Sequence, residues 1–475
     1  MTRTKIVATI GPASAKPEVF RLMLRAGLNV ARVNFSHGSH ESHQETIEMI
    51  RRIAREEGKV LAILGDLQGP KIRFGLLPDG GIELKSGDRL RMAPEATEPD
   101  IIPLPHPEIF PAIRPGSRMV IGDGELEFRV LAHRDNILTT EAIYPGLLES
   151  RKGINMPGTM LPISSITEKD KEDLLFACRM DLDYIALSFV RTADDIRELR
   201  EIMATCAANI PIIAKIEKSE ALEHLEEILH ESDGMMVARG DLGIDVPPQQ
   251  VPFLQKQIIR ACNEVGKPVI TATQMLQSMV SNPRPTRAEA SDVANAILDG
   301  SDAIMLSGET ASGKYPVESV LMMRHISEIT EQEFPYDVWQ QRRRQSIHDT
   351  TNITAAISAA CCGIAEEVDA SLIVSTTMSG YTARQIARHR PRTPIVAVSP
   401  LEQTQRRLAL VWGVECFIIP YFRKTDTMFK KTRQALRPLN LHKGERMVFS
   451  AGVPFGETGQ TNLITVQEIG APGFD

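Results

Sequence analysis

Cysteine is scarce in this chain of 475 residues, and no group of cysteines or histidines has the spacing of a metal site. Disulfides are rare in the reducing cytoplasm, and the six thiols are scattered along the sequence. We therefore expect all of them to be reduced residues that pack inside a cytoplasmic protein. They are Cys178, Cys206, Cys262, Cys361, Cys362 and Cys416.

Long hydrophobic runs and an excess of positive charge are absent as well. No apolar run reaches the roughly 18 residues of a membrane-spanning helix. The opening residues, MTRTKIVATI, have a strand-like pattern rather than the architecture of a signal peptide. The formal net charge is −7 and the pI is about 6.0, which argues against a general role in binding polyanions. We expect neither nucleic acid nor a membrane among the partners.

Short apolar runs alternate with longer amphipathic stretches along much of the chain. This alternation predicts parallel strands joined by crossover helices, and eight such units predict a closed (β/α)₈ TIM barrel. The expected strands are 6–10, 30–34, 61–66, 184–188, 212–215, 235–238, 269–272 and 303–306. The expected helices include 17–26, 43–57, 193–206, 252–265 and 287–298.

Two departures from this alternation indicate further domains. Residues from about 74 to 158 form short alternating runs with Gly, Asp and Pro turns, which predicts a small β-barrel lid domain inserted over the barrel mouth. Its hinges are expected near Arg73 and Pro157. Beyond a polar connector at 340–349, a second pattern predicts a C-terminal α/β domain. The expected domains are 1–72 and 159–340 for the barrel, 73–158 for the lid and 341–475 for the C-terminal domain.

Polar side chains gather at one end of the predicted strands. In a barrel of this kind the active site is built on the loops after the strands, whereas random scatter would place about half of these residues at the opposite end. One face of the barrel is therefore predicted to carry the function. The residues are Arg32, Asn34, Ser36, Asp66, Lys215, Glu217, Arg239, Asp241, Thr273 and Ser307.

The strongest motif combines IAKIE, which ends at Glu217, with ARGDLG, which contains Asp241. Strand alternation places Lys215 and Glu217 on the same side of the chain. Two carboxylates suit Mg²⁺, which binds a few carboxylates together with waters and substrate oxygens. A lysine ammonium neutralises a transferring phosphoryl group. The alternative, a structural salt-bridge cluster at a barrel rim, is disfavoured because two consecutive strands repeat the arrangement.

Three further motifs are each compatible with a plain turn when taken alone. ARVNFSHGSH contains an arginine that could bind phosphate, and Asn and Ser oxygens that suit a hard cation. The alternative is that this segment is only a capped turn. DLQGPKIR places an acid and two bases in a Gly-Pro turn at the lid entrance. The alternative is that it is only a solvated basic turn. TATQMLQSM places a hydroxyl at a strand end, where it could orient a water or a substrate oxygen. The alternative is that this threonine only caps a helix. The candidate side chains are Arg32, Asn34, Ser36, His37, Asp66, Lys71, Arg73 and Thr273.

The segment 282–316 contains a string, SGETASGK, that superficially resembles a phosphate-binding loop. It does not match G-x-x-x-x-G-K-[ST], and a nucleotide P-loop is therefore rejected. We expect the Asp and Glu residues of this segment to position arginines instead.

Nine stretches of the chain resemble, in the same order, those of the pyruvate kinase family. They are TKIVATIGPAS, NVARVNFSHGSH, DLQGPKIR, RKGINMPG, IAKIEKSEAL, MMVARGDLGIDVP, TATQMLQSM, PRPTRAEASDVANAILDGSDAIMLSGET and AGVPFGETGQTNL, and they extend from residue 2 to about residue 470. The resemblance implies a barrel, a lid inserted after its third strand and a C-terminal effector domain, in agreement with the segmentation above. It also implies a cytoplasmic homotetramer.

The resemblance further implies a glycolytic reaction, the transfer of a phosphoryl group from phosphoenolpyruvate to ADP to give pyruvate and ATP. Lys215 would stabilise the moving phosphoryl group, and Glu217 and Asp241 would bind Mg²⁺, with Mn²⁺ as a substitute. Hydroxyls or water at Thr273 and Ser307 would protonate the enolate. Arg32 would bind the substrate phosphate, and the backbone around Gly240 and the Thr273 hydroxyl would lie near the substrate carboxylate, with Lys215 and Asp241 also binding the substrate. The nucleotide would be bound by Asn34, His37, Arg73 and Lys152. Arg73 would also take part in catalysis, and Asp123 would lie near the substrate.

One departure from the commonest family pattern concerns the monovalent cation. K⁺-dependent members read Thr-Lys-Gly-Pro-Glu after the metal-site aspartate, whereas this chain reads Leu67-Gln68-Gly69-Pro70-Lys71, as does the K⁺-independent branch. An ammonium from Lys71 supplies the positive charge that a Glu-bearing site takes from K⁺. Activity is therefore expected without K⁺. The matching ligand positions are retained at Asn34, Ser36, Asp66 and Leu67.

The C-terminal segment STTMSGYTAR resembles the phosphate pocket of the family's effector site. Thr377, Ser379 and Thr382 would donate hydroxyls at a helix start, and an ordinary capped helix is the alternative. Tyr381 stands where relatives that respond to fructose bisphosphate often carry Arg, and the loop GETG at 456–459 adds an acid. We therefore expect a different phosphorylated effector, a sugar monophosphate or a nucleotide.

Two other functions remain open at this point. A metal-dependent barrel lyase or aldolase acting on a pyruvate enolate uses similar carboxylates, but it has no need of Arg73 and Lys152 at the lid. A catalytically inactive effector-binding protein is disfavoured by the intact Lys215, Glu217 and Asp241. We therefore predict a Mg²⁺-dependent, K⁺-independent, allosterically regulated member of the pyruvate kinase family.

Overall fold

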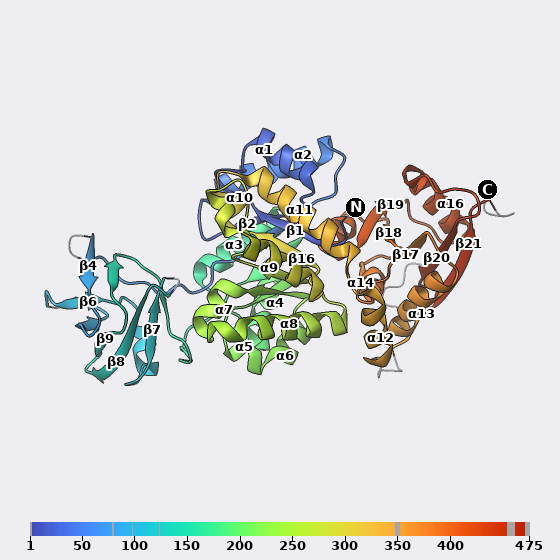
Figure 1. Ribbon diagram of the computed structural model, residues 1–475. Helices are drawn as coiled ribbons and strands as arrows, with labels where there is room; N and C mark the ends of the chain where they lie inside the picture. The colour runs from blue at the N-terminus through green and yellow to red at the C-terminus, as the bar shows by residue number, and fades with distance from the viewer. Residues whose placement is uncertain are drawn as a thin grey trace.

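The computed structural model describes residues 2–77, 80–96, 98–122, 124–346, 352–453 and 461–470, without the side chains of 342–346. Three bodies follow one another in Figure 1: a β domain at the left, a barrel in the centre and an α/β domain at the right. The predicted fold class, a TIM barrel with an inserted β domain and a C-terminal α/β domain, is confirmed. Two predicted features, Asp123 and the loop 456–459, lie outside the described residues.

Eight strands close the central barrel in the spatial order β1-β16-β15-β14-β13-β12-β3-β2. All neighbouring strands are parallel, as where Arg32 of β2 lies opposite Leu64 of β3. Their residues are mostly buried, because the helices cover one face of the strands and the barrel interior covers the other. The strands are β1 (Lys5–Thr9), β2 (Val30–Asn34), β3 (Ala62–Asp66), β12 (Tyr184–Leu187), β13 (Ile212–Ile216), β14 (Gly234–Ala238), β15 (Val269–Ala272) and β16 (Ala303–Leu306).

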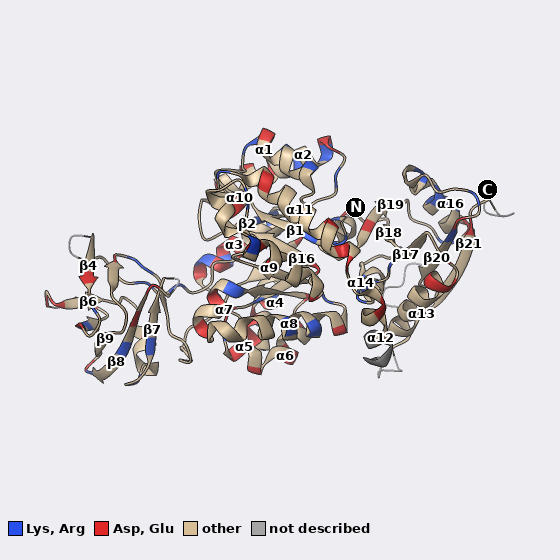
Figure 2. Ribbon diagram, viewed as in Figure 1, with Lys and Arg blue, Asp and Glu red and all other residues tan. Residues whose placement is uncertain are grey.

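Amphipathic helices surround the barrel, and several begin at a capping box. The side chains of Ser39, Thr167 and Thr286 each accept a backbone N–H three residues later in this way. In the view of Figure 2, charges of both signs are interspersed on these helices. Within the described ranges, no helix has the length and apolar character that crossing a bilayer requires. The helices are α1 (Pro17–Ala26), α2 (His40–Glu56), α3 (Glu168–Arg179), α4 (Ala193–Ala204), α5 (Glu220–Glu223), α6 (Leu225–Glu231), α7 (Arg239–Asp245), α8 (Val251–Val265), α9 (Arg287–Leu298), α10 (Gly308–Ala311) and α11 (Pro316–Gln332).

The inserted β domain lies between β3 and α3 in the chain. A six-stranded sheet in the order β11-β7-β8-β9-β5-β6 encloses its apolar core, and β4 pairs with β10 in a separate two-stranded sheet. Alternate residues of β8, such as Leu126, Phe128 and Val130, are buried in that core. A β-bridge between Arg73 and Gly153 joins the two connections to the barrel. The strands are β4 (Gly81–Leu84), β5 (Arg89–Ala93), β6 (Ile101–Pro103), β7 (Arg118–Ile121), β8 (Leu126–Arg134), β9 (Ile137–Ala142), β10 (Gly146–Glu149) and β11 (Ile154–Asn155).

The C-terminal domain is a five-stranded sheet in the order β19-β18-β17-β20-β21, in which only β21 is antiparallel to its neighbour. It sits at the amino-terminal end of the barrel strands. There Ala409 and Leu410 join the apolar cluster inside the barrel, and the Tyr184 hydroxyl donates to the Arg407 carbonyl at 2.7 Å. The elements are β17 (Leu372–Thr376), β18 (Ile395–Ser399), β19 (Val414–Ile418), β20 (Arg446–Ala451), β21 (Leu463–Glu468), α13 (Ile353–Glu367), α14 (Tyr381–Ala387), α15 (Glu402–Leu408) and α16 (Thr425–Ala435).

Two details differ from the sequence-based expectations. The connector expected at 340–349 is helical in its first part, which belongs to α12 (Tyr336–Ser346). The start of this polar helix is fixed by tertiary packing, because Tyr336 is buried against Phe334 and Trp412. All six cysteines are free thiols, but Cys206 is exposed rather than packed.

One buried ion pair joins the C-terminal domain to the barrel. Arg390, with 0% of its surface exposed, places a guanidinium nitrogen 3.0 Å from Asp302 Oδ1. It also donates to Asn263 Oδ1 at 2.8 Å, and its guanidinium carbon lies 4.7 Å from the ring centre of Trp412. Removing one partner of such a pair leaves the other charge buried and uncompensated.

We expect Arg390→Met to lower the free energy of unfolding by about 3–5 kcal/mol, because Asp302 would then be buried without its cation. The measurement is denaturant unfolding followed by tryptophan fluorescence and circular dichroism. The matched control is Arg260→Met, which removes an exposed pair to Glu264 within α8 and is expected to change little. Equal stability of the two variants would show that the buried pair is not needed.

Candidate active site

The carboxyl ends of the barrel strands bring four of the predicted charged residues into one row. The Lys215 ammonium lies 2.9 Å from Glu217 Oε1 and 3.3 Å from Asp66 Oδ1. On the other side of Asp66, Arg32 Nε lies 2.6 Å from Oδ2. The row Arg32–Asp66–Lys215–Glu217, called the charge row below, therefore alternates in sign across β2, β3 and β13.

Burial and pairing oppose each other within the charge row. Burial alone would raise the pKa of Asp66, but Arg32 and Lys215 hold it below its usual value. Burial would lower the pKa of Lys215, but Asp66 and Glu217 raise it above its usual value. Burial raises the pKa of Glu217 against the pull of Lys215, and Asp241 raises it further. Lys215 therefore remains an ammonium at neutral pH.

The turn after β12 contacts both ends of the Lys215–Glu217 pair. Ser188 Oγ accepts a hydrogen bond from Lys215 Nζ at 2.7 Å, and the Phe189 N–H donates to Glu217 Oε2 at 2.8 Å. Neither residue is among the predicted site residues, because Ser-Phe after an apolar run resembles the ordinary end of a strand. The available signal for Ser188 is its position directly after a barrel strand, the position that Ser307 also occupies.

Asp241 and Glu217 are the residues that fit a divalent cation. Asp241 lies in the first turn of α7, directly after β14, and lines the adjacent pocket. Within the described residues its carboxylate forms no hydrogen bond or ion pair. A carboxylate left open beside a second one suits Mg²⁺, which takes its other ligands from waters and substrate oxygens. No group of three or more His, Cys, Asp or Glu in the described part of the chain offers another metal site.

Two hydroxyls lie at the ends of β15 and β16. Thr273 has a positive φ of 65°, and its Oγ1 accepts the Gly240 N–H at 2.8 Å and donates to the Ala272 carbonyl at 2.7 Å. Ser307 donates its backbone N–H to Glu309 Oε2 at 2.7 Å. The Ser307 hydroxyl is buried and has no hydrogen-bond partner among the described residues. The structure thus gives Thr273 a fixed hydroxyl and leaves that of Ser307 available.

Arg239 follows β14, the neighbour of β13, but its side chain is not part of the charge row. One guanidinium nitrogen donates to the Thr273 carbonyl at 2.8 Å, and another lies 2.8 Å from Asp292 Oδ2. Arg239 is the first residue of α7, so its side chain leaves the strand end in a different direction from Asp241. Arg239 therefore supports the strained loop of Thr273, and an acid of the segment 282–316 positions it.

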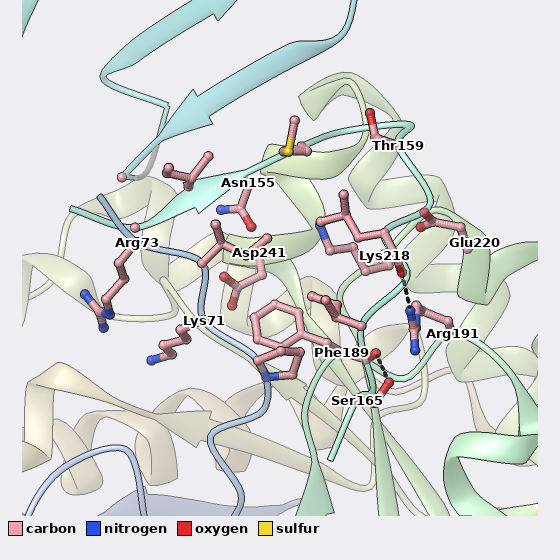
Figure 3. A pocket seen from close by; sticks show the side chains of 18 residues that line it. Lys71, Arg73, Asn155, Thr159, Ser165, Phe189, Arg191, Lys218, Glu220 and Asp241 are labelled. Atoms are coloured by element: carbon pink, nitrogen blue, oxygen red, sulfur yellow. Dashed lines mark hydrogen bonds between the residues drawn. The ribbon is translucent and has the colours of Figure 1, made fainter. Parts of the chain in front are cut away.

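A pocket of about 260 Å³ lies between the barrel and the β domain. In Figure 3, Lys71 and Arg73 stand on one side of Asp241, and Lys218, Glu220 and Arg191 line the other side. The ring of Phe189 and several aliphatic side chains form its apolar wall. The pocket thus combines a candidate metal ligand, basic groups and a surface that excludes water.

Lys71 brings an ammonium to the group predicted as the monovalent-cation position. Its Nζ lies 3.5 Å from Ser36 Oγ, and Asn34 Oδ1 accepts the Ser36 N–H at 3.2 Å. Partial burial, together with the nearby Arg73 and Lys215, lowers the pKa of Lys71, and neighbouring carboxylates offset part of this effect.

The residues predicted to contact a nucleotide are spread over the barrel and the β domain. His37 is exposed on the loop after β2, and Arg73 lines the pocket. Lys152 is instead paired inside the β domain, with its Nζ 3.0 Å from Glu125 Oε2 and 3.3 Å from Glu149 Oε2. In this conformation the structure brings Arg73, but not Lys152, to the pocket lining.

The predicted effector hydroxyls lie around the start of α14. Thr377 Oγ1 accepts the N–H of Gly380, the residue directly before α14, at 2.8 Å. The hydroxyl of Thr382 is buried and pairs with that of Thr461 at 2.6 Å. The Ser379 carbonyl accepts a hydrogen bond from Arg384 at 3.4 Å. Two of the three hydroxyls are therefore already used within the domain.

Comparisons with known proteins agree over nearly the whole chain. A family model described as the pyruvate kinase barrel domain matches residues 1–320, and one described as the pyruvate kinase alpha/beta domain matches residues 355–467. Pyruvate kinases of Geobacillus stearothermophilus and Sporosarcina psychrophila are 46% and 44% identical, over 98% and 99% of this chain and 80% and 81% of theirs. A crystal structure of a pyruvate kinase from Cryptosporidium parvum matches with a TM-score of 0.93 at 35% identity, over 98% of this chain and 96% of that one.

Proposed function

The chain belongs to the pyruvate kinase family, and from this premise we propose how its own residues carry out the family's reaction. The reaction moves the phosphoryl group of phosphoenolpyruvate to ADP and gives pyruvate and ATP. The observation that carries the proposal is the charge row, in which two fixed cations lie beside the candidate metal ligand Glu217. The second candidate ligand, Asp241, lines the neighbouring pocket. This arrangement suits a phosphoryl group better than the enolate alone, which favours phosphoryl transfer over a lyase.

Arg32 and Lys215 neutralise the phosphoryl group as it moves. Charge in such transition states is spread over the phosphoryl oxygens, so positioned cations do most of the work. Arg32 is already oriented by Asp66 and by the Thr9 hydroxyl, which accepts a guanidinium N–H at 2.8 Å. Groups held in place before the reaction need no reorganisation during it, which is the basis of electrostatic catalysis.

Glu217 and Asp241 are the residues that would hold Mg²⁺, with Mn²⁺ as a substitute. When bound, the ion supplies neutralisation of charge on the phosphoryl and enolate oxygens. The Phe189 N–H fixes one oxygen of Glu217 at 2.8 Å, so this carboxylate is oriented before the ion arrives. Burial is the main cause of the raised pKa of Glu217, and the Asp241 carboxylate raises it further. The nearby second carboxylate supports the assignment, because a cation between the two relieves their repulsion.

The backbone around Gly240 and the Thr273 hydroxyl are proposed to lie near the carboxylate of phosphoenolpyruvate, with Asp241 contacting the substrate beside them. The enolate left after transfer must gain a proton at carbon. We assign this step to a hydroxyl or water network at Thr273 and Ser307. The Ser307 hydroxyl supports the assignment, since it is buried without a partner in the described part of the chain.

The nucleotide is proposed to bind across the mouth of the barrel, against Asn34, His37 and Arg73. Lys152 would join it from the β domain after leaving its two glutamates. Glu125 and Glu149 are largely exposed, and exposed ion pairs contribute little, so this exchange is not costly. Movement of the β domain would also exclude water from the phosphoryl group.

Lys71 is proposed to replace K⁺. Its ammonium adjoins Ser36, one of the retained ligand positions, which supports this role. A side chain tied to the site supplies the positive charge without uptake of an ion.

The C-terminal site is proposed to bind a phosphorylated effector, a sugar monophosphate or a nucleotide, at Thr377, Ser379 and Thr382. The position of these residues at the start of α14 supports it. A homotetramer is proposed as well. The exposed Phe253 and Ile329 on barrel helices support an association surface.

The activity is tested by a coupled assay of pyruvate formation from phosphoenolpyruvate. We expect turnover that requires both ADP and a divalent cation. Lys215→Met should lower kcat by about 10²–10³-fold, because the phosphoryl group loses its ammonium. Lys171→Met, which changes an exposed lysine of α3, is the control and should retain wild-type turnover. Absence of ATP formation from ADP and phosphoenolpyruvate would instead favour the lyase.

The role of Lys71 is tested in tetramethylammonium buffer after removal of K⁺. The wild type is expected to be fully active there, and Lys71→Glu should be nearly inactive until K⁺ is added. The reason is that Glu places a negative charge where the site needs a positive one. Lys71→Glu that stays active without K⁺, or a wild type that needs K⁺, would disprove the replacement.

The effector site is tested by thermal shift with sugar monophosphates, nucleotides and fructose 1,6-bisphosphate. A ligand of the first two groups is expected to raise the Tm, and Thr377→Ala should remove that shift. Absence of a shift with every ligand, or a shift with the bisphosphate alone, would contradict the assignment.

A further inference from the structure

The turn after β12 adopts a backbone conformation that its residues do not favour. Phe189 has a φ of 55°, in the left-handed region where a bulky non-glycine residue is uncommon. Such strain persists only where the surroundings impose it, and it often marks functional positions. The contacts around this turn should therefore explain why Phe189 adopts the left-handed conformation.

Ser165 and Gly69 hold the turn in place. The Ser165 hydroxyl donates to the Phe189 carbonyl at 3.1 Å, a bond drawn in Figure 3. Gly69 packs so closely that a Cβ there would lie 2.8 Å from the Phe189 ring and 3.1 Å from Ser188 Cβ. The Gly69 N–H in turn donates to the buried Asp170 at 3.1 Å.

Ser188 has only one way to use its hydroxyl in this arrangement. Its proton is donated to the Leu67 carbonyl at 2.7 Å. The oxygen lone pairs therefore remain for Lys215, whose ammonium donates to Ser188 Oγ at 2.7 Å. The Leu67 carbonyl thus fixes the direction in which Ser188 receives the lysine.

Ser188 also differs in kind from the other two oxygens around Lys215. Glu217 and Asp66 lie 2.9 and 3.3 Å from the ammonium and neutralise it. Ser188 is closest and carries no charge, so it aims the ammonium without reducing the charge available to an incoming anion. A neutral acceptor can therefore orient a cation that acts on a substrate, whereas a further carboxylate would also neutralise it.

We propose that Ser188, oriented by the Leu67 carbonyl and by the strained Ser188–Phe189 turn, is a positioning residue that aims the Lys215 ammonium at the phosphoryl group. The kinetic consequence rests on the proposed function. The contact with Lys215 itself does not.

The kinetic test compares Ser188→Ala with Ser188→Thr, which keeps the hydroxyl. We expect Ser188→Ala to lower kcat by about 10²-fold with little change in the KM for phosphoenolpyruvate, because misplacing a reacting group costs rate rather than ground-state binding. Ser188→Thr should recover most of the loss. The matched control is Ser319→Ala, which removes another buried serine hydroxyl donating to a carbonyl in α11 and should leave kcat unchanged.

A second readout follows Lys215 directly and needs no turnover. Pulsed acylation of the folded protein at one fixed pH, resolved by lysine with mass spectrometry, reports how firmly each amine is held. Removing the Ser188 acceptor should raise the extent of Lys215 acylation above that in the wild type and in Ser319→Ala. Lys171 is the internal reference.

The two readouts separate the possible failures. Lys215 reactivity and kcat that match Ser319→Ala would overturn the role of Ser188, as would a folded Ser188→Thr that behaves like Ser188→Ala. A wild type without phosphoryl transfer would overturn the proposed function, whereas the acylation result would still decide the contact between Ser188 and Lys215.

Discussion

The pairing of the Lys215 ammonium with Asp66 and Glu217 is the interaction on which the site depends. A buried lysine without carboxylates would lose its proton, and buried carboxylates without a cation would gain one. The alternating charge row keeps Asp66 and Lys215 ionised although both are buried, whereas burial still raises the pKa of Glu217. In this surrounding, a charge acts on a substrate far more strongly than at an exposed surface. The same balance means that no member of the row can be removed without disturbing the others.

The barrel makes this arrangement possible because it delivers several strand ends to one place. The strands that carry Arg32, Asp66, Lys215 and the start of α7 lie on one arc of the closed sheet, with β12 between β3 and β13. At the opposite end, Ala409 and Leu410 fill the barrel, so the C-terminal domain supports the scaffold without reaching the site.

The fold was predictable to the extent that burial leaves a pattern in the sequence. The bounds expected for the strands that start at Val30, Val269 and Ala303 agree with β2, β15 and β16. For β15 and β16 the signal is a nearly continuous apolar run, because these strands are covered on both faces. The helix α12 was missed, since its stability comes from aromatic packing at Tyr336 rather than from its own polar sequence.

In the site, the spacing of Lys215 and Glu217 predicted a shared face. Ser188 and Phe189 carried no such signal, because a left-handed turn at Phe189 follows from contacts with Gly69 and Ser165, which are distant in sequence. Arg239 was expected with the other charges, but the start of α7 directs it to Asp292.

Lys71 shows how a tethered cation differs physically from a bound ion. Partial burial and the nearby Arg73 and Lys215 lower its pKa, so the charged form is disfavoured relative to an ordinary lysine. As the pH rises, this ammonium therefore loses its proton before an unperturbed lysine does, whereas K⁺ has no proton to lose. The carboxylates of Asp66 and Asp241 counteract the effect. The charge of Lys71 is therefore linked to Asp66, which pairs with Lys215, and to Asp241, the proposed ligand of the divalent cation. In the proposed role, the tethered charge removes the need for an external ion but makes the alkaline limit of the site depend on its own acids.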